Sequence, residues 1–307
     1  MLCGWRTLSD IPLTCVATLE RGGEGVDILI QIAHGHSPIA KSAGRVVFEH
    51  LSQYSLIKIQ GVADFEVTEG RHIRVWPAAG ATQKDIEIFL FGPAWATLCH
   101  QRGMLPLHAS AILTQGGITA FAGHSGAGKS TIAALLGSFG YELVTDDILP
   151  VSFNRDSVPE AWPYLRRLKL QRGPVDELAL TPRELVSERL DKEKYFVQPK
   201  CVAHDKGSRL KRLYLLENDS TIKYPSIDRI TGAEAVRILI DQTYHFQFIL
   251  GSGRFRAHLL TCTQLASKIA IYRLLRPSIY CAAAELAPVI SAHLENLEHD
   301  FDVRREF

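Results

Sequence analysis

The segment GHSGAGKST at residues 123–131 has the residue types and spacing of a phosphate-binding loop, GxxxxGK followed by Ser or Thr. Its glycines permit backbone angles and close approaches that a Cβ would forbid, so successive N–H groups can turn inward around an anion. A helix that begins at the lysine points its positive end at the same place. The candidate nucleotide-binding residues are Gly123, His124, Ser125, Gly126, Ala127, Gly128, Lys129, Ser130 and Thr131.

Two of these side chains have chemical roles of their own. Lys129 can place a full charge on the outer phosphates, and Ser130 can offer a hydroxyl to Mg²⁺. The loop directly follows the apolar run Ile118–Ala122 and precedes the apolar run TIAALL, which is the strand-loop-helix context that the motif requires. That context disfavours the alternative of a glycine-rich turn without a ligand. The pattern therefore predicts a site for the phosphates of a nucleoside triphosphate together with Mg²⁺.

Asp146 and Asp147 follow the apolar run Leu143–Thr145, and Asp146 lies 17 positions after Lys129. Ligands bind where parallel strands end, and a carboxylate there, close to a phosphate-binding loop, is typical of an Mg²⁺ ligand. One carboxylate can hold the metal while the other accepts a proton from an attacking hydroxyl. The sequence does not decide which residue has which role. The alternative is that the pair only caps a turn.

The elements that must position these groups fall into two parts, with a boundary near residue 103. The first part has short β-rich runs punctuated by Gly, Ser and Pro, then one helical segment that Thr82 can cap. We therefore predict an α/β fold in which a small β-rich N-terminal domain, residues 1–103, precedes a P-loop domain, residues 104–307. The N-terminal elements expected are strands at Val26–His34, Gly44–His50, Ser55–Gln60, Asp64–Glu69 and Arg71–Pro77, a tight turn at Glu69-Gly70, and a helix at Lys84–Arg102 that Gly92-Pro93 splits.

The second part alternates strands with helices. Gly137 is expected to end the helix after the loop, and Ile148–Phe153 is expected to pair with the strand before it. The elements expected are strands at His108–Leu113, Ile118–Ala122, Tyr141–Thr145, Ile148–Phe153, Leu210–Glu217 and Ala270–Leu274, and helices at Lys129–Leu136, near Val175–Leu190, at Gly232–Tyr244, around Ala257–Ile269 and from Ser278 to about Asn296.

Composition limits the classes of partner. The 307 residues carry a formal net charge of +1, which gives no general electrostatic case for nucleic acid or an anionic membrane. The six cysteines have no CxxC or zinc-type spacing, so we expect reduced thiols. No signal peptide and no apolar run of about 18 residues is present, which predicts a cytoplasmic protein without a membrane span. Whether it forms a homo-oligomer stays open.

The string LHASAILTQGGITAFAGHSGAGKSTIAALLGSFGYELVTDDILPV resembles the catalytic domain of HPr serine kinase/phosphorylase, because the parts follow in the same order with the same short spacing to Asp-Asp. A closer resemblance is to the HPr-kinase-related proteins of bacterial ribosomal-peptide clusters, lasso-peptide clusters among them. The segments QRGMLPLHAS and IAIYRLLRP are similar to theirs. The resemblance covers about residues 45–300 and is strongest over 104–150.

This resemblance implies an ATP- and Mg²⁺-dependent kinase that acts on a Ser or Thr hydroxyl of a peptide or protein, with a fold shared with phosphoenolpyruvate carboxykinases. Lys129, Ser130, Asp146 and Asp147 match the family's functional positions. His108 matches its active-site histidine, which implies contact with the substrate or γ-phosphate, or a role in keeping an aspartate ionised. A half-buried structural histidine is the alternative.

One departure from the family concerns the metal site. The family's downstream Glu-x-x-Gly segment helps to bind the metal, whereas the nearest segment here, Tyr164–Leu170, has no Glu and is cationic. A second metal ligand and the phosphorylase reaction are therefore in doubt. Arg167 or Lys169 can instead steady the transferring phosphoryl group, or merely form a solvated edge. The rival functions are a nucleotide hydrolase and a non-catalytic ATP sensor.

Two further features bear on how an acceptor is held. Gly251–Gly253, followed by Arg254 and Arg256, can form a substrate loop or simply the turn before a helix. The N-terminal β region can recruit a peptide by edge-strand pairing, or it can only cover the kinase core.

Overall fold

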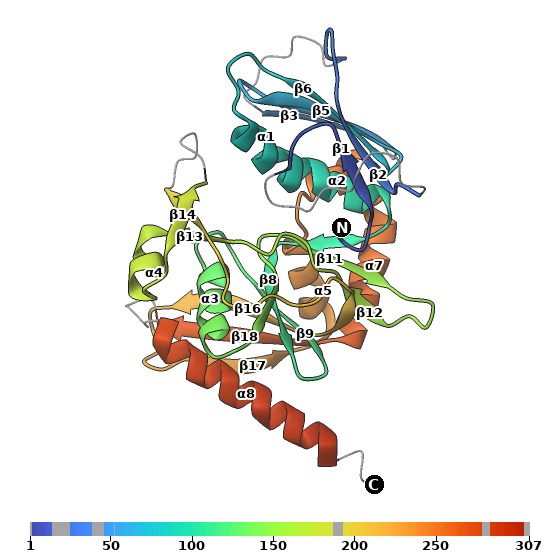
Figure 1. Cartoon of the computed structure of the whole chain (residues 1–307). Coiled ribbons are helices and arrows are strands. Elements are labelled where there is room, and N and C mark those ends of the chain that lie inside the picture. Colours follow the sequence, from blue (N-terminus) through green and yellow to red (C-terminus); the bar gives the residue numbers. More distant parts are fainter. Residues whose placement is uncertain are drawn as a thin grey trace.

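The computed structural model describes residues 2–13, 25–38, 46–51, 53–186, 193–277 and 283–303. Two sheets dominate it: a six-stranded N-terminal sheet and a nine-stranded sheet that carries helices on both faces (Figure 1). A three-stranded sheet flanks the larger one. The fold is therefore mixed α/β, as predicted.

The N-terminal sheet has the strand order β1-β2-β6-β5-β4-β3. The chain turns between β5 and β6 at Glu69-Gly70, where both residues have positive φ and the N–H of Arg71 bonds the carbonyl of Thr68 at 3.0 Å. This is the tight turn that the sequence predicted. The short parallel strand β1 was not predicted. The strands are β1 Thr7–Ser9, β2 Ile28–Ile32, β3 Val46–His50, β4 Tyr54–Ile59, β5 Ala63–Thr68 and β6 His72–Pro77.

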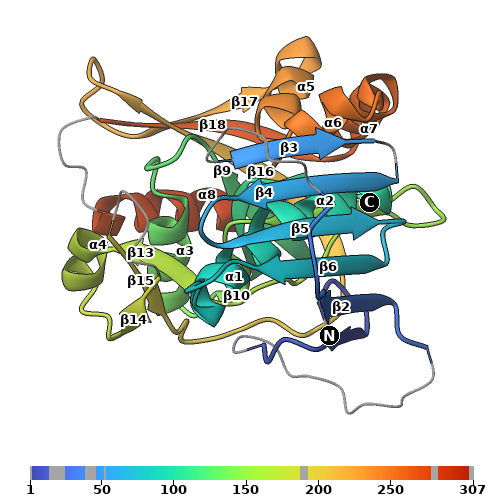
Figure 2. The same ribbon diagram turned by 90° about the horizontal axis from the view of Figure 1, so that it is seen from above.

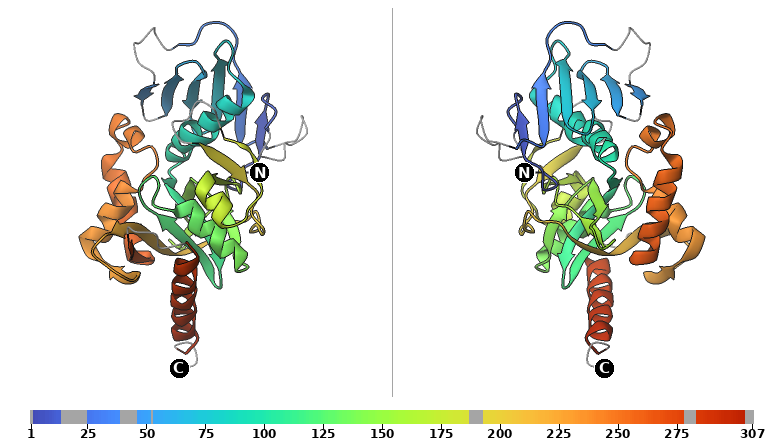
Figure 3. Two further views of the ribbon diagram at one scale, coloured as in Figure 1. Left: turned by 90° about the vertical axis from the view of Figure 1, so that its left-hand side faces the viewer. Right: turned by 90° about the vertical axis from the view of Figure 1, so that its right-hand side faces the viewer.

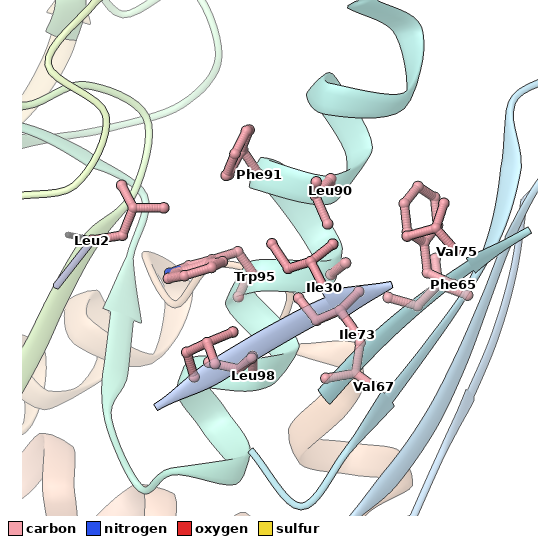
Figure 4. Packing of buried hydrophobic residues seen from close by; sticks show 14 of the residues in the cluster. Leu2, Ile30, Phe65, Val67, Ile73, Val75, Leu90, Phe91, Trp95 and Leu98 are labelled. Carbon is pink, nitrogen blue, oxygen red and sulfur yellow. The ribbon is translucent and has the colours of Figure 1, made fainter. Parts of the chain in front are cut away.

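One face of this sheet is closed by the helical segment α1 (Gln83–Phe89), η1 (Leu90–Ala94) and α2 (Trp95–Gln101). Thr82 caps α1, because its Oγ1 accepts from the N–H of Asp85 at 3.1 Å. Gly92-Pro93 interrupts the helix as predicted, with a non-helical backbone at Gly92. Figure 4 shows Trp95 and Leu98 of this segment packed with residues of the strands.

The larger sheet has the order β10-β8-β9-β16-β12-β11-β7, with β18 paired to β16 and β17. Strands β9, β16 and β18 are mutually parallel, and β8 runs antiparallel to both β9 and β10. The strands are β7 Leu105–Leu107, β8 Ala109–Thr114, β9 Gly117–Ala122, β10 Glu142–Thr145, β11 Leu149–Phe153, β12 Pro159–Ala161, β16 Ser208–Asp219, β17 Ser226–Ile230 and β18 Ala270–Pro277.

Alternate residues of β16 face two different cores, which is why the sheet is covered on both sides. Leu213 and Leu215 pack with α5 (Gly232–Asp241) and α7 (Phe255–Lys268), whereas Tyr214 and Leu216 pack with α3 (Lys129–Ser138) and α8 (Ala283–Val303). Helix α8 projects away from the N-terminal sheet (Figure 3). The remaining elements are α4 Arg172–Glu177, α6 Gln247–Gly251, and β13 Leu168–Gln171, β14 Pro182–Leu185 and β15 Lys194–Val197 of the small sheet.

Three expectations for this part were wrong. Gly137 does not end α3, which continues to Ser138 and has Phe139 as its C-cap residue. Strand β11 does not pair with β10: it pairs with β7 and β12, because the chain reverses away from β10 after the aspartates. The helix expected near Val175–Leu190 is only the short α4, and Pro182 begins a strand of the small sheet instead; residues 187–192 lie outside the described ranges.

Residues on both sides of position 103 share one core. The N-terminal sheet ends at Pro77 and the larger sheet begins at Leu105, but the N-terminal core also includes Ile148, Tyr164 and Leu165. The hydroxyl of Tyr164 donates to the carbonyl of Phe91 at 2.9 Å. Apolar burial therefore fastens the N-terminal part to the larger sheet.

None of the helices in the described ranges combines the length and apolar character needed to cross a bilayer. Cys3, Cys99 and Cys262 are buried free thiols and Cys201 is an exposed one, while Cys15 and Cys281 lie outside the described residues.

Three histidines lie where β3, α2 and the residues before α6 meet. The ring of His50 lies 5.3 Å from that of His245 and 5.4 Å from that of Phe248, and the ring of His100 stacks on Phe248 at 5.1 Å. Burial lowers the pKa of His50 to about 4 and the pKa values of His100 and His245 to about 3. All three rings are therefore neutral at neutral pH.

Acidification is expected to destabilise the protein through these histidines. The pKa values of these histidines in the folded protein lie below the ordinary value of 6.5, so the unfolded chain binds more protons in acid. The stability that the neutral rings contribute above pH 6.5 is therefore lost as the pH falls toward their pKa values in the folded protein. We expect a loss of roughly 1 kcal/mol per histidine between about pH 7.5 and about pH 5.5 in denaturant melts. Both ring nitrogens of His50 are buried without a hydrogen-bond partner, so His50→Phe should reduce this pH dependence. An unchanged slope in that variant would contradict the assignment.

Candidate active site

The phosphate-binding loop, His108 and the two aspartates lie at one edge of the nine-stranded sheet. Ala122 ends β9 and pairs with Ala109, the first residue of β8, which places His108 beside the loop. Strand β10 pairs with the other side of β8, which brings Asp146 and Asp147 to the same edge. Because β9 and β10 are each antiparallel to β8, they run in the same direction without pairing.

The loop turns sharply because three of its glycines have a left-handed backbone. Their φ values are +145° at Gly123, +88° at Gly126 and +97° at Gly128. A Cβ on Gly123 would lie 2.7 Å from the carbonyl oxygen of Leu216 and 3.1 Å from the Cβ of Ala127. Close packing against β16 therefore excludes any side chain at position 123.

Gly123→Ala is expected to destabilise the protein by about 1 to 3 kcal/mol, because it combines an unfavourable backbone conformation with a contact to an immobile carbonyl. Gly137→Ala is the matched control. Gly137 lies inside α3 with nothing within 4 Å of the Cβ position, so alanine there should stabilise the helix by roughly 0.5 to 1 kcal/mol. Urea melts of both variants should give opposite signs, and equal signs would contradict the loop geometry.

Lys129 begins α3 and is only 7% exposed. Its Nζ donates to the carbonyls of Gly123 at 2.7 Å and His124 at 3.1 Å. Burial lowers the pKa of Lys129, while the carboxylates of Asp147 and Asp146 oppose that shift. The ammonium group thus lies across the loop, where a bound phosphate can replace the two carbonyls as its hydrogen-bond acceptor.

Asp146 is buried and held by three donors. Its Oδ1 accepts from the hydroxyls of Ser110 at 2.5 Å and Ser130 at 2.8 Å, and its Oδ2 accepts from the N–H of Lys169 at 2.9 Å. Burial raises the pKa of Asp146, which the hydrogen bond from Ser110 opposes and the charge of Asp147 reinforces. The carboxylate is therefore fixed in position, next to the hydroxyl of Ser130.

Asp147 is more open, with 27% of its side chain exposed. Its Oδ2 lies 2.7 Å from Nζ of Lys169, and its Oδ1 lies 3.5 Å from Nε2 of His108. Burial acts to raise the pKa of Asp147, but the charge of Lys169 outweighs it and holds the pKa below its ordinary value. Its backbone φ of +83° is uncommon for a residue with a side chain. Asp147 is therefore an ionised carboxylate aimed by a constrained turn.

His108 is anchored through its backbone, since its N–H donates to the carbonyl of Gln242 at 2.7 Å. Its ring packs edge-on against Tyr244 at 5.4 Å. Burial lowers the pKa of His108 to about 4, although the charge of Asp147 opposes that shift. The imidazole is therefore neutral at neutral pH and can either donate to Asp147 or accept a proton.

These groups surround a cavity of about 490 Å³, within the range of small-molecule sites. Four cations face it, Lys129, Lys169, Lys194 and Arg276, against three carboxylates that include Glu177. The N-terminal part contributes Ile88 to the wall. Volume, cations and loop geometry together suit a polyphosphate ligand.

The structure brings most of the predicted residues into this cavity. Three loop residues do not line it: Gly123 and His124 offer their carbonyls to Lys129, and Ala127 is buried in a hydrophobic core. Arg167 stacks on the ring of Phe196 at 4.0 Å and is not among the lining residues. The predicted residues that do line the cavity are His108, Ser125, Gly126, Gly128, Lys129, Ser130, Thr131, Asp146, Asp147 and Lys169.

Sequence reasoning missed several supporting residues. Gln242 accepts from the N–H of Gly123 at 2.9 Å, although the two residues lie 119 positions apart. Ser110 donates a hydrogen bond to Asp146. Arg276 lines the cavity, and its Nε donates to the side-chain oxygen of Asn218 at 2.5 Å. No short sequence motif predicts these contacts, because each joins residues that are far apart in the sequence and meet only in the folded protein.

The oxygen donors at the site suit Mg²⁺. Within the described ranges, no group of three or more His, Cys, Asp and Glu side chains is placed to hold a metal by itself. Mg²⁺ commonly takes one or two carboxylates and completes its shell with water and substrate phosphates. The hydroxyl of Ser130 and the carboxylate of Asp146, 2.8 Å apart, fit that pattern.

Comparisons with known proteins give a structural likeness only. No protein-family model matches the chain, and a search of curated proteins finds no match. A search of solved structures finds a likeness to the HPr(Ser) kinase/phosphatase from Coxiella burnetii, with a TM-score of 0.34 and 12% identity, covering 64% of this chain and 98% of that one. A likeness of this degree assigns no function, which must be inferred from the chain's own residues.

Proposed function

We propose that this protein is an ATP- and Mg²⁺-dependent kinase that phosphorylates a Ser or Thr hydroxyl of a peptide or protein. The acceptor that we propose is a ribosomally made precursor peptide, such as that of a lasso peptide. The observation that carries the proposal is the contrast between two adjacent carboxylates beside a phosphate-binding loop. Asp146 is buried and fixed against Ser130, whereas Asp147 is open to the cavity and paired with His108.

The first carboxylate and the loop are assigned to the nucleotide. The loop N–H groups and Lys129 hold the phosphates, and Ser130 with Asp146 offers oxygens to the metal. Mg²⁺, when bound, neutralises charge on the β- and γ-phosphates. Lys169 and Arg276 face the same cavity and can balance charge on the transferring group.

The second carboxylate is assigned to the acceptor. The hydroxyl oxygen forms a bond to the γ-phosphorus, the bond from that phosphorus to the bridging oxygen breaks, and its electron pair leaves with ADP. The hydroxyl proton passes to Asp147, which neighbouring His108 helps to orient. A base placed apart from the metal ligand supports a kinase over a pure ATP sensor, which needs no base.

The test is mass spectrometry of candidate peptides after incubation with ATP and Mg²⁺, beginning with any precursor peptide encoded next to this gene. We expect a gain of phosphate on Ser or Thr that is absent with Lys129→Ala. Consumption of ATP without a change in peptide mass would support a hydrolase instead. Tight binding of ATP without turnover would support the sensor.

A further inference from the structure

A second cavity adjoins the first one at His108. It has a volume of about 400 Å³ and is lined by Pro93 of η1 and by residues of the α5–α6 connection, among them Tyr244 and Phe246. His108 lines both cavities, and its Nε2 lies 3.5 Å from the carboxylate of Asp147. His108 therefore borders both the second cavity and the open aspartate.

An apolar surface continues outward from this cavity. Phe246 lies 6.5 Å, ring to ring, from Phe255 at the start of α7. Helix α7 buries one stripe, His258, Cys262 and Leu265, against the core, while its first two turns also expose apolar side chains. We call this outer surface the α6–α7 face; it comprises Leu250, Phe255, Leu259 and Leu260, which are 63%, 47%, 37% and 62% exposed.

Asp241 lines the second cavity, but the charged side chains that follow it up to Lys268 have a single sign. Residues 242–268 contain no Asp or Glu, whereas they contain Arg254, Arg256 and Lys268. The chain as a whole is nearly neutral at +1, so the local excess is a property of this surface. Clustered exposed apolar side chains among cations mark an interaction surface for a partner that is apolar and acidic.

We propose that the α6–α7 face docks an acidic, leucine-rich segment of the peptide acceptor and that the second cavity leads its hydroxyl-bearing residue to Asp147. This inference rests on the proposed kinase function and names the substrate surface of the same site. Helix α6 packs against β3, the edge strand of the N-terminal sheet, and α7 packs against α6 (Figure 2). The N-terminal part thus borders the docking surface and contributes Pro93 to the cavity.

The test uses a labelled synthetic peptide of leucines, aspartates and one serine, and a second peptide with lysines in place of the aspartates. Binding to the full chain is followed by fluorescence anisotropy. We expect the acidic peptide to bind and Leu260→Asp to weaken it at least roughly tenfold, because the change places a like charge in the apolar contact. The control is Phe139→Asp, a comparably exposed residue (55%) at the far end of α3, which should leave binding unchanged.

Three results would overturn the docking proposal: equal binding by the two variants, equal binding of the lysine peptide, or Leu260-dependent binding to phosphatidylglycerol vesicles without binding of the peptide. ATP binding and phosphate transfer are measured on the same samples. If the acidic peptide binds through Leu260 but receives no phosphate from ATP, the kinase proposal fails and docking stands. If transfer is undiminished in Leu260→Asp, docking fails and the kinase stands.

Discussion

Lys129→Ala is expected to lower kcat for phosphate transfer at least about 1,000-fold, since loss of a single neutral donor to a developing charge already costs about 100- to 1,000-fold. Lys129 is the cation at the start of α3, 7% exposed and aimed across the loop. Its loss removes a full charge from the outer phosphates. Single-turnover transfer from labelled ATP would measure the effect.

Two controls separate charge from folding. Lys129→Met keeps the aliphatic stem and should be as inactive as the alanine variant, whereas alanine at Lys206, an exposed lysine, should be fully active. Burial lowers the pKa of Lys129, so the folded state disfavours its charge, and thermal melts should show little destabilisation. Transfer within tenfold of the wild type by Lys129→Met would contradict the mechanism.

Asp147→Asn is expected to lower kcat by roughly 100- to 10,000-fold, the range of general base catalysis, while ATP binding changes little. The asparagine keeps the shape of the side chain but cannot accept the proton of the acceptor hydroxyl. Steady-state kinetics with varied ATP, together with calorimetric ATP binding, would separate the two effects. Parallel loss of turnover and ATP binding would mean that Asp147 is structural.

Lys169→Ala provides an independent readout of the same base. The ammonium of Lys169, 2.7 Å from Asp147, helps to hold the pKa of that carboxylate below its ordinary value. Removing it raises the pKa of Asp147, so the acid limb of the kcat profile should move to higher pH. An unmoved acid limb in Lys169→Ala would assign proton acceptance to another group.

Asp146→Asn should instead raise the Mg²⁺ concentration needed for half-maximal activity, because Asp146 lies against Ser130.

The sequence by itself predicted the features that depend on the conformation of a short stretch of backbone. The loop at residues 123–131, the strand before it and the helix after it are one continuous segment. Its positions with a left-handed backbone are glycines, so the residue type alone predicts them. The turn at Glu69-Gly70 and the helix break at Gly92-Pro93 were predictable for the same reason. In each case neighbouring residues determine the conformation.

Only the tertiary structure distinguished the two aspartates. Asp146 and Asp147 are identical in type and adjacent in sequence, yet one meets Ser110, Ser130 and the backbone of Lys169 while the other meets His108 and the ammonium group of Lys169. Those partners come from two strands, a helix and the bend between β7 and β8. Burial and charge at a site are sums over such distant groups, and no local pattern encodes them.

The same reason explains the strand pairing and the second cavity. Expecting β11 beside β10 followed from closeness in sequence, but β7 and β12 offered β11 its hydrogen-bond partners. The path from the α6–α7 face through Phe246 to His108 joins residues more than 130 positions apart. The backbone conformation of the phosphate-binding loop depends on residues that are neighbours along the chain. The surroundings of the two aspartates, and the surface by which an acceptor reaches them, depend on which distant segments pack together in the folded protein.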